Sequence, residues 1–189
     1  MKIYTKKGDT GLTTVYNGKK IYKNNILIDC LGDLDEFNCE LGCLISFSIN
    51  DDKIIFDPNY LDILMDIQRQ LFDIGYYLSC DKVNEKTSLI LEYIYKEYLN
   101  KIEKSIDDMT DNMPVLTNFI IPGGNIIQSL SHRCRAICRR FERKLVNLKY
   151  NGYNIDDLCI SYINRISDFL FTYSRYIGYI NDEKDTIKI

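Results

Sequence analysis

The segment from Phe119 to Leu148 restricts the possible folds of this chain more than any other stretch. It opens with an apolar trio and a Pro122-Gly123-Gly124 break, and a long helical pattern follows with Asn125 as a candidate N-cap. At about 100° per residue, one face of this pattern is a continuous apolar stripe, which predicts a helix that packs against a core. The stripe consists of Ile127, Leu130, Cys134, Ile137, Cys138, Phe141, Leu145 and Leu148.

A row of basic side chains runs beside the apolar stripe. Guanidinium groups keep their protons, so stacked arginines repel one another unless an anion lies against them. A solvated basic face is the usual explanation, but here the arginines flank the apolar arc instead of opposing it. The pattern favours a polyphosphate site, because arginine makes paired hydrogen bonds to phosphate oxygens. The adjacent arc holds His132, Arg135, Arg139 and Arg143 with Glu142 at its edge, and Arg133, Arg140 and Lys144 lie further round.

Composition and charge place the chain among single-domain globular proteins. It has 189 residues, of which 46% are hydrophobic and 27% charged. A net charge of −3 argues against a general nucleic-acid binder, because the basic cluster is local. We find no targeting segment and no apolar run near the roughly 20 residues that a membrane helix needs. We expect a cytoplasmic protein with no nucleic-acid or membrane partner.

The seven cysteines are odd in number and form no C-x-x-C motif. Cys39 with Cys43, and Cys134 with Cys138, are spaced one helical turn apart and could clip a metal ion. The alternative is that they are small buried hydrophobes in a reducing compartment. We favour the second interpretation.

Four further segments have helical periodicity, at residues 30–48, 60–80, 88–109 and 153–180. Together with the arginine helix they predict an all-α fold, a five-helix antiparallel bundle. One domain covers residues 1–189. Its bundle spans 30–180, and a charged tail at 181–189 is expected to be loose.

Residues 1–29 differ from the rest of the chain. Ile3 to Thr5 and Leu12 to Tyr16 are β-prone, and Asn17-Gly18 is a strong turn signal. The Gly/Thr/Lys loop at residues 6–11 offers backbone N–H groups, hydroxyls and cations, which suit phosphate. It lacks the Walker A spacing, so an ordinary hairpin turn also explains it.

Two polar groups on the other helices have alternative explanations. Asp35 could pair with the basic row across two helices, or it could be a surface carboxylate favoured by the helix dipole. Asn164 and Asp168 lie one turn apart and could act together, or they could only form surface hydrogen bonds.

Five blocks of the chain, in order and at matching spacing, resemble the PduO-type ATP:corrinoid adenosyltransferases. They cover nearly the whole sequence: KIYTKKGDTG at 2–11, GDLDEFN at 32–38, FIIPGG at 119–124, SHRCRAICRRFER at 131–143 and INRISDFLF at 163–171. The resemblance implies transfer of the 5′-deoxyadenosyl group of ATP to the cobalt of cob(I)alamin, which forms adenosylcobalamin and releases triphosphate. It also implies a homotrimer with active sites between subunits, and Mg²⁺ carried mainly by the ATP phosphates.

The resemblance also implies roles for individual residues. Arg135 matches the arginine most tied to catalysis, Asp35 its partner across the subunit boundary, and Phe119 the aromatic residue on the lower axial side of cobalt. His132 matches a family histidine, for which we expect a positioning role. The implied ATP-binding residues are Thr5, Lys6, Lys7, Gly8, Thr13, Thr14, Lys23, Arg139, Arg140, Phe141, Glu142, Arg143 and Asn164.

Three positions depart from the family pattern. Lys7 stands where the family has Thr, Thr10 where it has Lys, and Phe141 where it has Ala. The first two changes move one positive charge within the loop. The sequence therefore does not determine which residues of the loop contact the phosphates.

Two other functions compete with the enzyme. The same pocket could serve a non-catalytic carrier of ATP and adenosylcobalamin for a B12-dependent mutase. Residues 133–149 could instead form an RNA-binding helix, against which the acidic net charge argues. For the enzyme, a corrinoid reductase and a B12-dependent mutase are the expected partners, and the preferred corrinoid stays open.

Overall fold

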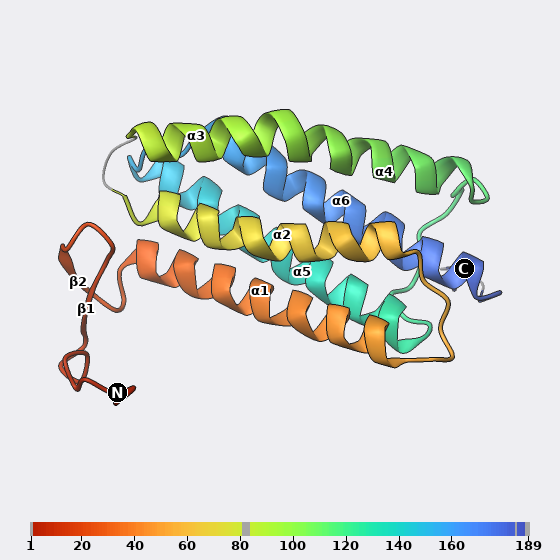
Figure 1. Cartoon of the computed structure of the whole chain (residues 1–189), viewed down its shortest axis with the longest axis horizontal. Helices are drawn as coiled ribbons and strands as arrows, with labels where there is room; N and C mark the ends of the chain where they lie inside the picture. The colour runs from red at the N-terminus through yellow and green to blue at the C-terminus, as the bar shows by residue number, and fades with distance from the viewer. Residues whose placement is uncertain (1, 81–83, 184, 188–189) are drawn as a thin grey trace.

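The computed structural model describes residues 2–80, 84–183 and 185–187 of the chain. Its elements follow one another along the sequence as Figure 1 labels them. They are β1 (Leu12–Thr14), β2 (Lys20–Tyr22), α1 (Ile26–Asn50), α2 (Pro58–Leu78), α3 (Glu85–Tyr93), the π-helix η1 (Ile94–Leu99), α4 (Asn100–Asp111), α5 (Ile126–Tyr150) and α6 (Asp157–Ile180).

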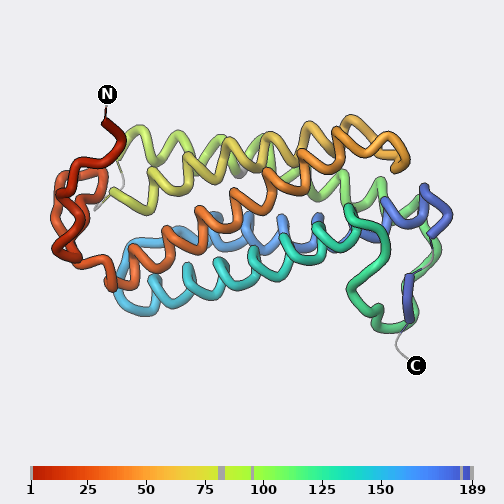
Figure 2. Tube along the Cα trace, turned by 90° about the horizontal axis from the view of Figure 1, so that it is seen from below, coloured from red at the N-terminus to blue at the C-terminus, as the bar shows by residue number. Residues whose placement is uncertain are grey.

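The helices form an elongated antiparallel bundle (Figures 1 and 2). Because α3, η1 and α4 continue one another, the described residues make five helical rods. α5 packs against both α1 and α6, while α2 packs on α1 and α4 on α6. The predicted all-α fold and five-helix bundle are confirmed. Among the described residues, no helix is both long and apolar enough to cross a membrane.

The helix starts follow from side-chain caps. The Asn25 side chain accepts a hydrogen bond from the Leu27 N–H at 2.9 Å, so α1 begins at Ile26 and not at the predicted residue 30. Asn125 and Gln128 form a reciprocal capping box at the start of α5, as predicted for Asn125. The last helix begins at Asp157 instead of 153, because Asp156 caps it. The remaining predicted bounds differ from the observed ones by a few residues.

The predicted stripe on α5 is buried along its whole length. Its largest member, Phe141, is fully buried where α5 meets the rest of the core. α6 packs against α5 and buries side chains in the same core, including Tyr162, Ile166 and Tyr173. The apolar periodicity therefore predicted both the helix and the side that it buries.

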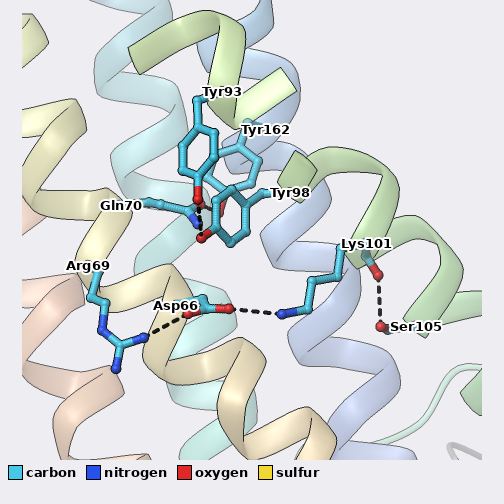
Figure 3. Close-up of polar contacts among 8 residues, drawn as sticks. All are labelled: Asp66, Arg69, Gln70, Tyr93, Tyr98, Lys101, Ser105 and Tyr162. Atoms are coloured by element: carbon cyan, nitrogen blue, oxygen red, sulfur yellow. Dashed lines mark hydrogen bonds and ion pairs between the residues drawn. The ribbon is translucent and has the colours of Figure 1, made fainter. Parts of the chain in front are cut away.

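A polar cluster fastens the α3–α4 rod to the bundle (Figure 3). The hydroxyl of Tyr162 on α6 donates to the side chain of Gln70, which is only 3% exposed on α2. Asp66, one turn earlier on α2, accepts from Lys101 of α4 at 2.9 Å and from Arg69 at 2.8 Å. These contacts pair the Gln70 oxygen and the Asp66 carboxylate within a largely apolar contact between helices, whereas the buried Nε2 of Gln70 has no partner among the described residues.

The N-terminal segment contains a hairpin at the predicted Asn17-Gly18 turn. β1 and β2 pair antiparallel with Thr13 opposite Ile21, and Gly18 takes φ +83° in the turn, where a side chain would be strained. The β-prone stretch from Ile3 to Thr5 forms no strand, so that prediction is wrong. Ile3 is 98% exposed, and β propensity alone does not hold a strand without a partner.

The C-terminal tail lies against the loop that joins α4 to α5 (Figure 2). The N–H of Ile121 donates to the carbonyl of Thr186 at 2.7 Å, and Ile120 forms an antiparallel bridge with Ile187. Residues 181–183 and 185–187 of the tail that was predicted to be loose therefore make defined contacts. Positions 184, 188 and 189 of that prediction lie outside the described residues.

Candidate functional site

The outer basic side chains of α5 are neutralised by α1. Arg133 lies 2.5 Å from Glu40, and the Nε of Arg140 lies 3.4 Å from Asp33. Arg140 also pairs with Glu36, and Lys144 with Asp29. The four acids recur at helical spacing on the side of α1 that faces α5, so this contact is a ladder of opposite charges.

The inner basic row has no such partners. Among the described residues, Arg135, Arg139 and Arg143 make no ion pair. Arg139 and Arg143 are exposed, while Arg135 is half-buried and its Nε is buried without a hydrogen-bond partner. Burial, and then the charge of Arg139, lowers the pKa of Arg135, but a guanidinium stays protonated at neutral pH. A positive charge left in this position calls for an anion from outside the fold.

Among the described residues of one chain, Asp35 does not pair with the basic row of α5, which favours the alternative of a surface carboxylate within that chain. Asp35 is exposed, makes no ion pair among the described residues, and lines a groove of about 340 Å³ between α1 and α2. It points away from α5 because the α1 face toward α5 carries Asp33 and Glu36 instead. Its proposed pairing with Arg135 of a neighbouring subunit stays a prediction.

Phe119, His132 and Arg135 meet at one cavity of about 710 Å³. The loop before α5 forms one wall, and the Phe119 side chain on it is 86% exposed. α5 contributes His132 and Arg135, and α6 contributes Phe171, whose ring centroid lies 6.1 Å from that of His132. The cavity thus joins an exposed aromatic ring to an unpaired cation.

His132 is a neutral, buried wall of this cavity. It is 6% exposed, and its Nδ1 has no hydrogen-bond partner among the described residues. Burial, followed by the charge of Arg135, lowers the pKa of His132, while Asp185 opposes the shift. A histidine held neutral in this way can position a ligand by one hydrogen bond, and its positioning role stays a prediction.

Five of the predicted ATP-binding residues gather around a second cavity, of about 620 Å³, in the N-terminal segment. The cavity is lined by Lys20 and Thr10 as well, so it combines two ammonium groups with several hydroxyls. Such a set of donors suits phosphate oxygens. The lining residues are Thr5, Lys7, Gly8, Thr10, Leu12, Thr13, Thr14 and Lys20.

Lys6 and Lys23 shape this loop without lining the cavity. Lys6 takes φ +59°, a strained value for a residue with a side chain. A Cβ added at Gly8 would lie 3.2 Å from the Lys23 Nζ, so the glycine lets the ammonium group approach the loop. Lys20 was left out of the predicted ATP-binding set, although its position in a hairpin opposite Thr14 could have indicated it.

The remaining predicted ATP-binding residues are not brought to this loop. Arg139 and Arg143 point to solvent on α5, and Arg140 is engaged by α1. Glu142 and Asn164 are half-buried, on α5 and α6. Asp168 pairs with Arg165 at 2.8 Å, so we find no joint site with Asn164.

The prediction of Phe141 as an ATP contact is wrong for its side chain. The ring is fully buried in the core, and burial leaves it no face for a nucleotide. The bulky replacement of the usual Ala is a feature of packing.

The cysteines agree in part with the expectation of buried hydrophobes. All seven are free thiols, and Cys30, Cys134, Cys138 and Cys159 are buried. Burial raises the pKa of Cys30 and of Cys134 to about 12, so both stay protonated. Cys39 and Cys43 are exposed on α1, contrary to the expectation. In the described ranges no group of three or more His, Cys, Asp or Glu side chains could hold a metal ion.

The fold and the two cavities define a helical-bundle protein with one cavity suited to a polyphosphate and another suited to a large, partly apolar ligand. Residues 3–177 match the model of the cobalamin adenosyltransferase family, and the chain therefore belongs to that family. The resemblance noted in the sequence is confirmed.

Two curated relatives and one solved structure illustrate the match. The chain is 33% identical over 181 residues to the corrinoid adenosyltransferase of Bacillus subtilis, covering 94% of this chain and 87% of the relative. It is 32% identical over 176 residues to the corrinoid adenosyltransferase MMAB of Homo sapiens, covering 93% and 68%. A variant of the PduO-type ATP:corrinoid adenosyltransferase from Lactobacillus reuteri, complexed with cobalamin and ATP, superposes with a TM-score of 0.85 at 30% identity over 99% of both chains.

Proposed function

We propose that the protein transfers the 5′-deoxyadenosyl group of ATP to the cobalt of cob(I)alamin. The electron pair of Co(I) attacks the 5′ carbon, the cobalt–carbon bond forms, and the carbon–oxygen bond breaks. Triphosphate leaves with that bonding pair, and cobalt is oxidised from Co(I) to Co(III). The observation that carries the proposal is the unpaired Arg135 guanidinium on the same cavity as the exposed ring of Phe119.

The leaving group determines which side chains the reaction needs. Triphosphate gains charge as the bond breaks, and preorganised cations and N–H groups stabilise that charge. Lys7, Lys20 and the nearby Lys23 supply ammonium groups at the N-terminal cavity. Arg139 and Arg143, which make no ion pair among the described residues, supply guanidinium groups. No side-chain nucleophile is needed, because cobalt itself attacks.

Mg²⁺ would reach the site on ATP. Mg²⁺ in nucleotide sites is usually held by substrate phosphates with one or two carboxylates. The described residues offer no three-ligand cluster of their own, but the N-terminal cavity is rich in donors for a phosphate chain. Bound there, the ion would add positive charge beside the leaving triphosphate.

Phe119 keeps the lower axial position of cobalt free of a ligand. Removing that ligand makes reduction to Co(I) easier, and an apolar ring next to the metal excludes both water and the ligand. The ring projects from a loop that Pro122 and the following glycines stiffen and turn. An apolar side chain that is 86% exposed at a cavity wall is well placed for this role.

The complete site lies between subunits of a homotrimer. Within one chain, the N-terminal cavity shares no lining residue with the cavity at Arg135. Figure 1 shows the hairpin beyond the end of the bundle where α1 begins. Asp35 is exposed beside the exposed rings of Tyr16 and Phe72, which gives the α1–α2 groove the composition of a subunit contact. Asp35 of one subunit then pairs with Arg135 of its neighbour and supplies the missing anion.

The reaction also defines the neighbouring steps. Co(I) requires a low-potential reductase that acts on the corrinoid, and adenosylcobalamin is consumed by a B12-dependent enzyme such as a mutase. We place all of these in the cytoplasm, where buried free thiols such as Cys134 and Cys138 stay reduced.

An anaerobic assay tests this function. Purified protein, chemically reduced cobalamin, Mg²⁺ and ATP are mixed, and the cobalt–carbon absorbance change is followed. We expect light-sensitive adenosylcobalamin and one triphosphate for each product. Tight binding of ATP and cobalamin without product would contradict the enzyme and favour the carrier.

A further inference from the structure

The loop that carries Phe119 has little packing of its own. Val115 and Phe119 on it are 88% and 86% exposed, and Ile121 is 51% exposed. The buried Met113 anchors the start of the loop in the core, but the exposed side chains after it give the rest of the loop little apolar packing. Its position must be determined by contacts at its edges.

The C-terminal tail supplies some of these contacts. The Ile121 N–H donates to the Thr186 carbonyl at 2.7 Å. The carboxylate of Glu183 accepts from the backbone and side-chain N–H groups of Asn125, at 3.0 and 3.3 Å. The loop is therefore held on its far side by a short segment that follows α6.

Arg175 joins α6, the tail and the loop. Its Nε donates to Asp185 at 2.8 Å, and its Nη2 donates to the carbonyl of Pro114 at 3.1 Å. Its side chain is only 10% exposed, so both partners meet a guanidinium that water barely reaches. A fork of two N–H donors in fixed geometry is what distinguishes arginine from lysine.

A further cavity, of about 410 Å³, lies beneath these contacts. Arg175 and Asp185 line it, and it shares Leu116, Thr117 and Asn118 with the cavity at Phe119. The loop thus separates two cavities, and from Pro114 to Asn125 its hydrogen bonds to α6 and the tail, among the described residues, are those made by Arg175, Thr186 and Glu183.

We propose that Arg175 is a positioning residue, which holds the Phe119 ring against the lower face of the corrinoid by tying Pro114 to Asp185. The inference rests on the proposed function. Loss of the guanidinium leaves the buried side of Asp185 unpaired and frees the loop. The consequence is specific, because a displaced Phe119 fails to exclude the lower ligand while the ATP-binding parts stay intact.

The test compares two corrinoids in three variants. Arg175→Met removes both hydrogen bonds of the tie, and Asp185→Asn weakens it by removing the carboxylate charge, a change confined to the tail. Arg165→Met is the matched control, because Arg165 also lies on α6 with two carboxylate partners, Glu103 and Asp168, but faces α4. Adenosylation rates are measured with cobalamin and with cobinamide, which lacks the lower ligand.

We expect Arg175→Met and Asp185→Asn to slow adenosylation of cobalamin about 10- to 100-fold, the usual effect of a small misplacement of a group at a reacting centre. Cobinamide should react at nearly the wild-type rate, and Arg165→Met should leave the ratio of the two rates unchanged. Equal loss with both corrinoids, or no loss in either variant, would overturn the proposal.

Hydrogen exchange of the loop amides gives a second result that needs no turnover. The amide of Ile121 should exchange faster in Arg175→Met and in Asp185→Asn than in the wild type or in Arg165→Met. Unchanged protection would overturn the tie itself. An inactive wild-type protein whose loop still loosens in the variants would instead contradict the proposed function.

Discussion

Arg140 and Asp33 face each other across the contact of α5 and α1, with 3.4 Å between the Nε and a carboxylate oxygen. The same contact neutralises Arg133 and Lys144. Arg135 lies on the adjacent arc of α5 and receives no carboxylate among the described residues. The helix thus separates cations that are paired with α1 from a cation that has no carboxylate partner among the described residues of one subunit.

Replacing Arg135 by Ala should lower kcat by about 100- to 1000-fold, as expected when a donor to developing charge is lost. The KM for ATP should change little, because the N-terminal cavity does not include this residue. Arg133→Ala is the control, since its exposed pair with Glu40 is worth at most about 1 kcal/mol. Steady-state rates at saturating substrate concentrations measure kcat for both variants. Undiminished turnover in Arg135→Ala would show that Arg135 takes no part in the reaction.

Phe119→Ala should slow adenosylation of cobalamin more than that of cobinamide. The ring excludes the lower ligand, and cobinamide has none to exclude. Val115 is another exposed apolar residue of the same loop, but it does not line the cavity at Phe119. The variant Val115→Ala should therefore react like the wild type. Paired single-turnover rates measure the effect, and equal slowing with both corrinoids would reduce Phe119 to a packing role.

Lys20→Ala should raise the KM for ATP about tenfold, which corresponds to one lost hydrogen bond with a charged partner. Lys20 lines the N-terminal cavity, whereas its neighbour Lys19 does not, so Lys19→Ala serves as the control. Initial rates over a range of ATP concentrations and calorimetric titration with ATP provide the measurement. If both variants bind ATP like the wild type, the cavity is not the phosphate site.

Phe141→Ala should lower the free energy of unfolding by about 3–5 kcal/mol, the usual cost of truncating a buried aromatic residue. The ring is fully buried, so ATP affinity measured well below the unfolding temperature should not change. Denaturant unfolding followed by circular dichroism gives the first quantity. Weakened ATP binding by the folded variant would restore the residue to the nucleotide site.

The bundle could be predicted from the sequence because its signals are local. The apolar stripe of α5 repeats at helical spacing, and Asn125 caps the helix with Gln128. The acids on α1 could also have been found, since Asp29, Asp33 and Glu36 recur on one face. Asp35 was considered as the partner of the basic row instead, because the sequence does not indicate which face of α1 packs against α5.

The contacts of the C-terminal tail and the cavity at Phe119 could not be predicted from local sequence patterns. A charged C-terminal segment resembles a loose one, and the bridge of Ile120 with Ile187 joins residues too far apart for any local pattern to reveal. The cavity at Phe119 depends on the loop, α5 and α6 together. Helical periodicity accounts for Phe119 and Arg135 one at a time and does not bring them to one cavity. Only the resemblance of the sequence blocks indicated that the two residues act at the same site.

The most direct test concerns the claim that one adenosyl-transfer site needs groups from two subunits. A variant with a defective N-terminal loop, Lys7→Ala with Lys20→Ala, is co-expressed with Arg135→Ala, and mixed oligomers are assayed for adenosylcobalamin formation. If the site is shared in a cyclic trimer, about one quarter of the sites combine an intact loop with an intact Arg135, and activity returns. If the site lies within one chain, every site keeps a defect, and mixtures as inactive as the separate variants would contradict the shared site.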